Sequence, residues 1–143
     1  MAVRLIRPPH PRHLTDVGGR MTKTQLETIR YMNIHFKDSK LEKYAKDERL
    51  CIRKLGKEQA EKYLKRIDQL YNAETLEDTR YLPGHYHELT EDRKGQWGCD
   101  LVQPDRLVFE PYEQPIPTSE DGGYIWKEIK AINIIEIINY HGK

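Results

Sequence analysis

The sequence predicts an α+β fold in which helices pack on an antiparallel sheet. Apolar residues recur at helical spacing in the first half of the chain, and the pattern changes to strand-like alternation after Pro83-Gly84. The elements therefore run as a strand, helical segments, and then strands joined by short turns, an order typical of this class. A length of 143 residues suits one domain with an extension.

The N-terminal part differs from the rest in composition. Residues 1–31 hold six basic and two acidic residues, and the prolines at 8, 9 and 11 block regular structure. We therefore expect a basic, disordered extension over 1–31 and a compact domain over 32–143. The compact part has a small excess of acidic residues, which excludes a general nucleic-acid coat protein. If the compact part binds nucleic acid, it must do so through a local basic patch.

The helical half of the domain has clear boundaries. Alternation over 33–36 predicts a short strand, and Asp38 or Ser39 can cap a following helix. Helical character continues over 48–55 and ends at Gly56. Apolar residues at three- and four-residue spacing then predict an amphipathic helix over 57–72.

The second half has the pattern of a sheet. Segments 96–102 and 106–110 alternate as strands, and Pro104-Asp105 between them is a turn signal. Residues 111–123 are rich in Pro and Gly, which predicts a loop. A β-branched run over 132–140 predicts the last strand, buried on at least one face.

Composition also excludes several classes of protein. No apolar run approaches the roughly 18–20 residues that a membrane span requires, and the N-terminus has no apolar core of a secretory signal. Cys51 and Cys99 cannot make a disulfide framework or a four-cysteine zinc site. We expect a cytoplasmic protein with ordinary thiols and no membrane partner.

Two segments carry side chains suited to RNA chemistry, residues 85–97 and 139–143. RNA cleavage without a metal needs groups that move protons at the 2′-hydroxyl and the 5′-oxygen, and fixed donors for the phosphorane. Histidine and tyrosine exchange protons, arginine binds phosphate, and aromatic rings stack on bases. A metal site formed by His85, His87 and His141 is an alternative interpretation of the same histidines.

The domain over 32–143 resembles the HigB-type toxins of the RelE/ParE superfamily. The resemblance rests on several short motifs taken together. They are Lys54-Leu55-Gly56, His87-Glu88-Leu89, Asp92-Arg93-Lys94-Gly95-Gln96-Trp97, Arg106-Leu107-Val108-Phe109-Glu110 and Glu136-Ile137-Ile138-Asn139-Tyr140-His141. The resemblance implies two N-terminal helices packed on a curved antiparallel β-sheet, the RelE-like fold.

The resemblance further implies a ribosome-dependent mRNA endoribonuclease, the toxin of a type II toxin–antitoxin module. It cleaves by 2′-hydroxyl attack on the adjacent phosphate, with no cofactor and no metal. Its partners are a helix-turn-helix antitoxin of the HigA type, the ribosome and mRNA. His87 or His141 is then the general base. The implied catalytic residues are His87, Arg106, Tyr140 and His141, and the implied RNA-binding residues are Arg93, Lys94, Trp97, Asn139 and Lys143.

Two other functions are compatible with the same superfamily, because membership alone does not fix activity. One is a ParE-like inhibitor of gyrase, which needs no nuclease residues. The other is a catalytically degenerate member that only binds the antitoxin. Asn139 and Thr90 favour the degenerate member, since relatives often carry Asp and Lys at these positions.

Overall fold

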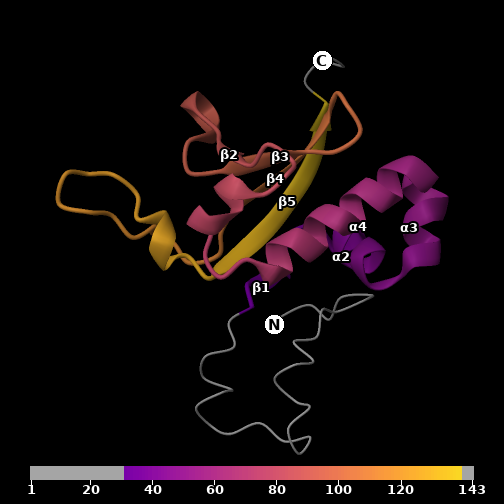
Figure 1. Cartoon of the computed structure of the whole chain (residues 1–143), viewed down its shortest axis with the longest axis horizontal. Helices are drawn as coiled ribbons and strands as arrows, with labels where there is room; N and C mark the ends of the chain where they lie inside the picture. The colour runs from indigo at the N-terminus through magenta and orange to yellow at the C-terminus, as the bar shows by residue number, and fades with distance from the viewer. Residues whose placement is uncertain (1–30, 140–143) are drawn as a thin grey trace, which may run out of the picture.

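A computed structural model describes residues 31–139 as a three-helix layer packed on a five-stranded sheet (Figure 1). Tyr140–Lys143 and all but the last residue of the predicted extension over 1–31 lie outside the described residues. The elements are β1 (Asn33–Phe36), α2 (Ser39–Lys46), α3 (Glu48–Leu55), α4 (Lys57–Asn72), η2 (Glu77–Tyr81), β2 (His87–Glu88), η3 (Glu91–Arg93), β3 (Trp97–Asp100), β4 (Asp105–Pro111), η4 (Trp126–Glu128) and β5 (Ala131–Asn139).

Aspartate caps divide the first helical segment into two helices. The Asp38 carboxylate accepts a hydrogen bond from the Lys40 backbone N–H at 2.8 Å, at the start of α2. Asp47 does the same for Leu50 at 3.1 Å and begins α3. Gly56, at φ 85°, then turns the chain into α4, a conformation that glycine adopts readily.

One apolar layer lies between α4 and the sheet. Ala60, Tyr63, Ile67 and Leu70 form the buried side of α4, and the Tyr63 hydroxyl donates to the Leu41 carbonyl at 2.7 Å. They pack in a single cluster with core-facing residues of the central strands, which are Trp97, Cys99, Leu107, Phe109, Ile132 and Ile134. The three α-helices are therefore on one side of these strands, as Figure 1 shows.

The strand order is β1-β5-β4-β3-β2. Neighbours from β2 to β5 pair antiparallel, but β1 pairs parallel to β5, with Ile34 opposite Ile132. A bulge between Val108 and Phe109 shifts the register of β4 against β5. The last strand of the chain thus lies inside the sheet, between the first strand and β4.

The predicted arrangement of two N-terminal helices on an antiparallel, RelE-like sheet is therefore wrong. The sheet is mixed, because it contains one parallel pair of strands. Three α-helices follow the first strand in the sequence, and short 3₁₀ helices lie between the later strands. The fold is broadly α+β. Alternation in a sequence shows which side of a strand is apolar but not which strand pairs with it, so the parallel pairing of β1 left no signal.

Across residues 31–139, no helix is both long enough and apolar enough to span a bilayer.

Candidate active site

The face of the sheet opposite the helices carries a polar cluster. Along β3 and β4, side chains alternate between the two faces, so the strands that send Trp97 and Phe109 into the core send others outward. The outward positions meet through the pairings His87 with Gly98, Gly98 with Val108 and Asp100 with Arg106. Three strands therefore bring His87, Asp100 and Arg106 to one surface.

His87 and Arg106 make direct contact in this cluster. Nε2 of His87 lies 3.1 Å from Nη1 of Arg106, and Nδ1 of His87 lies 2.8 Å from the His85 carbonyl oxygen. A carbonyl only accepts, so Nδ1 must carry the proton, and the guanidinium then donates to the lone pair on Nε2. These partners select one neutral tautomer, with its basic nitrogen facing the arginine.

The surroundings of His87 favour this neutral form. Burial is the main cause that lowers its pKa from the ordinary value of 6.5, and the charges of His85 and Arg106 lower it further. The hydrogen bond to the His85 carbonyl and the carboxylate of Asp100 act in the opposite direction. A neutral imidazole is the form that can accept a proton.

Asp100 lies close to the side chains of Arg106 and His85. One of its carboxylate oxygens, Oδ1, is 3.6 Å from Nε of Arg106 and 3.7 Å from Nδ1 of His85. The His85 ring stacks on the His87 ring with centroids 4.2 Å apart. One carboxylate, one guanidinium and two imidazoles therefore form a continuous cluster.

The cluster opens into a pocket of about 520 Å³ beneath η3. The residues that line the pocket are His87, Glu88, Leu89, Thr90, Glu91, Asp92, Arg93 and Arg106. Residues 89–96 form a loop that closes on itself before β3, because the Leu89 N–H donates to the Gln96 carbonyl at 2.8 Å. Gly95, at φ 94°, lies in the turn of this loop. His87 and Arg106 form part of the pocket wall, where a phosphate group could reach both.

The charges around the pocket are mixed. Arg80 donates to Glu88 at 2.5 Å, and Arg93 donates to Glu136 at 2.6 Å. The opposite charges within each pair therefore cancel. Glu91 and Asp92 are exposed on η3. The pocket thus has a basic floor at Arg106 and an acidic rim.

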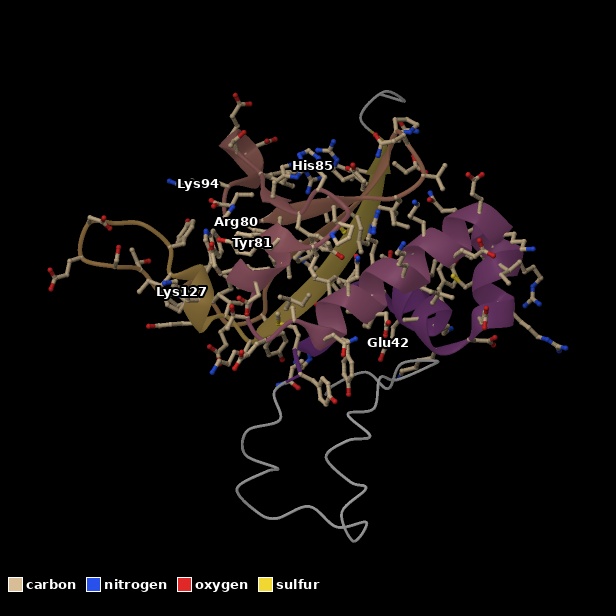
Figure 2. The ribbon with its side chains drawn as sticks, in the orientation of Figure 1. Glu42, Arg80, Tyr81, His85, Lys94 and Lys127 are labelled. Carbon is tan, nitrogen blue, oxygen red and sulfur yellow. The ribbon has the colours of Figure 1, made fainter. Side chains whose placement is uncertain are left out.

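The predicted RNA-binding residues occupy different environments. Arg93 lines the pocket, but its guanidinium already binds Glu136 and Gln96. Lys94 is exposed, with its ammonium 5.9 Å from the centre of the Tyr124 ring, and Figure 2 shows it at the outer end of this segment. Lys94 therefore carries an exposed positive charge and does not line the pocket.

Trp97 does not fit the base-stacking role predicted for it. It is 0% exposed and packs edge-on against Trp126, with ring centroids 5.4 Å apart, while the Arg80 guanidinium covers it at 4.7 Å. The alternation of β3 points Trp97 toward the helices, so its large side chain fills the core. Arg80 on η2 therefore packs on the core tryptophan and pairs with Glu88 at the pocket.

The end of β5 lies beside Arg106. Ile138 is opposite Arg106 in the register, and Asn139 is opposite Asp105. Tyr140, His141 and Lys143 follow directly in the chain, and their predicted roles lie outside the described residues.

Sequence reasoning missed Asp100 and Gly98 as parts of the site, and it considered His85 only as a metal ligand. Alternation places Gly98 and Asp100 on one face of β3, but only the pairing of β3 with β4 brings them beside Arg106, and this pairing leaves no local signal. Within the part of the chain that the structure describes, no group of three or more His, Cys, Asp or Glu side chains is arranged to hold a metal ion.

No protein-family model matches the chain, and comparisons with curated proteins and with solved structures find no match either.

Proposed function

We propose that the protein is an endoribonuclease whose phosphate-binding residue is Arg106 and whose general base is His87. The contact of 3.1 Å between His87 Nε2 and Arg106 Nη1, in the wall of a pocket, is the observation that carries the proposal. An arginine beside a neutral histidine suits a phosphodiester with an adjacent hydroxyl, because one group binds the anion and the other removes the proton.

The proposed reaction needs no bound metal. A phosphate oxygen takes the place of Nε2 as the acceptor of the Arg106 hydrogen bond, and this frees the histidine lone pair. His87 Nε2 then removes the 2′-hydroxyl proton as the 2′-oxygen attacks phosphorus, and Arg106 stabilises the charge on the phosphorane. The bond from phosphorus to the 5′-oxygen breaks, which leaves a 2′,3′-cyclic phosphate and a 5′-hydroxyl once that oxygen is protonated.

The acidic rim favours RNA that is already held by another partner. Glu91 and Asp92 repel a free polyanion at the entrance, since both carboxylates are exposed beside the pocket. A ribosome would hold mRNA in position and remove this cost of binding. This argument supports the ribosome-dependent mRNA interferase, the toxin of a type II toxin–antitoxin module that the motifs from 54 to 141 resemble.

The same proposal includes the partners and the compartment. A HigA-type helix-turn-helix antitoxin would bind the toxin, and the reaction would take place in the cytoplasm, where the ribosome and mRNA are. Tyr140 and His141 remain candidates for contact with the nucleotide, because they follow Asn139 in the sequence and Ile138 pairs with Arg106.

The test is cleavage of a defined mRNA by the full chain, both free in solution and bound in stalled ribosomes. We expect cuts on the ribosome that leave a 2′,3′-cyclic phosphate, and a loss of roughly 100-fold or more in His87→Gln and in Arg106→Ala. Arg49→Ala on the exposed side of α3 is the matched control and should cleave normally.

The same assay separates the alternatives. Intact mRNA together with inhibition of purified gyrase would indicate a ParE-like inhibitor. Intact mRNA, active gyrase and tight antitoxin binding would indicate a degenerate member. Products that carry a 5′-phosphate and a 3′-hydroxyl would contradict the metal-independent reaction, because they indicate attack by a metal-activated water.

A further inference from the structure

His85 has an unusual backbone and a fixed position beside the proposed base. Its φ is 58°, in the left-handed region that few residues other than glycine adopt and in which histidine is enriched. Residues held in this region cluster at active sites and ligand-binding sites. The conformation directs the His85 carbonyl to Nδ1 of His87 and lays the two rings on each other, with only 20° between their planes.

Asp100 lies beside one of the two ring nitrogens of His85. Oδ1 of Asp100 lies 3.7 Å from Nδ1 of His85, so the carboxylate faces this side of the ring and Nε2 points elsewhere. The His85 side chain is 62% exposed, and Figure 2 shows it at the surface above β2 and β3. The titratable and charged groups that face it are Asp100 on β3, His87 on β2 and, through Asp100, Arg106 on β4.

The proposed reaction requires a second proton-carrying group. His87 presents a lone pair at Nε2, so it takes up a proton and cannot give one to the leaving oxygen in the same step. The other cationic group of the cluster is a guanidinium, which is a poor general acid. His35, another histidine within residues 31–139, is on β1 at the opposite edge of the sheet. His85 is one ring away from the base.

We propose that His85 is the general acid that protonates the 5′-oxygen as the bond between it and phosphorus breaks. Nε2 of His85 donates the proton, the electron pair of that bond goes to the oxygen, and His87 holds the proton taken from the 2′-hydroxyl. Asp100 is the positioning residue that orients His85. This inference rests on the proposed endoribonuclease function.

The test compares two leaving groups in ribosome-bound mRNA at the position that the unmodified protein cuts. One substrate has the natural 5′-oxygen and the other a bridging 5′-sulfur, which leaves as a thiolate and does not need an acid. The variant is His85→Asn, because asparagine tolerates a positive φ but carries no transferable proton. His35→Asn makes the same chemical change at the far edge of the sheet and is the matched control.

We expect His85→Asn to cut the oxygen substrate roughly 100-fold or more slowly, and to cut the sulfur substrate at a rate close to that of the unmodified protein. His87→Gln should be slow on both substrates, because the attack on phosphorus still needs a base. Thermal unfolding of His85→Asn near that of His35→Asn would show that the loss is not a loss of folding.

Other outcomes overturn the inference in distinguishable ways. Normal cleavage of the oxygen substrate by His85→Asn, or an equal loss on both substrates, would refute the role of His85 and leave the nuclease intact. Sulfur rescue in His141→Ala but not in His85→Asn would assign the acid to His141. No cleavage by the unmodified protein would refute the proposed function and the inference together.

Discussion

Gly98→Ala should separate catalysis from stability. The side chain of Arg106 lies over Gly98 of β3. A Cβ atom at Gly98 would be 3.1 Å from Arg106 Cδ and 3.3 Å from Leu89 Cδ2. Both distances are shorter than ordinary contact, so the arginine has to move by a few tenths of an ångström. Such a shift takes the Arg106–His87 contact from 3.1 Å to about 3.5 Å, where a hydrogen bond is largely lost.

The expected magnitude follows from this displacement. Misplacing a catalytic group by 1 Å costs up to roughly 100-fold in rate, so about half that shift should cost about 10-fold. Alanine is better than glycine in a strand by about 0.5–1 kcal/mol, which offsets the crowding, so the free energy of unfolding should change by less than about 1 kcal/mol. The cleavage rate should therefore fall while the free energy of unfolding stays nearly unchanged.

The assay is RNA cleavage beside denaturant unfolding, with an NMR titration of His87 as a readout independent of activity. Since the Arg106 charge lowers the pKa of His87, displacing the arginine should move this pKa upward. Gly123→Ala is the matched control, because its Cβ would meet nothing closer than 3.5 Å, in an exposed loop. Full activity with an unchanged His87 titration would refute the reasoning.

Four further results are expected. The pKa of His87 lies below 6.5, mainly through burial, so an NMR titration should give a midpoint under that value, and a midpoint at or above it would contradict the burial argument. Because burial favours the neutral form of His87, protonation of this side chain opposes folding. The contribution of neutral His87 to the free energy of unfolding is complete above pH 6.5 and is lost as the pH falls through the pKa of the folded protein. The difference in the free energy of unfolding between the unmodified protein and His87→Gln, measured against pH, checks this prediction. Arg66→Met should destabilise the fold by about 3 kcal/mol in urea unfolding, because the buried guanidinium donates to two main-chain carbonyls that would lose their partner; a change under about 1 kcal/mol would be inconsistent with those bonds. Burial raises the pKa of Cys51 to about 11 and that of Cys99 to about 12, so iodoacetamide should modify neither thiol in the folded protein at neutral pH, and rapid labelling that precedes unfolding would count against this packing.

Local patterns predicted the elements well where one signal dominated. The helix expected over 57–72 is α4, with the same bounds, because four buried apolar side chains recur on one side and glycine marks its start. The β-branched run over 132–140 predicted β5, which spans Ala131–Asn139. Asp47 ends one helix and caps the next, a division that apolar periodicity does not reveal.

The site was predictable in part. His87 and Arg106 were each expected at the site from the motif resemblance, and the structure brings the two into contact. Trp97 was expected at the RNA, but strand alternation alone does not say which side of β3 is covered by helices. Asp100 and Gly98 matter because three strands meet there, and such non-local contacts are absent from any local pattern.

The position of β5 has a consequence for the protein while it is being made. This strand is the last of the described elements to be synthesised, yet it pairs with both β1 and β4, and Arg106 lies directly opposite Ile138. A nascent chain therefore cannot join its first strand to the rest of the sheet until β5 has left the ribosome. The proposed nuclease would therefore stay inactive until β5 has been synthesised and has paired with both neighbouring strands.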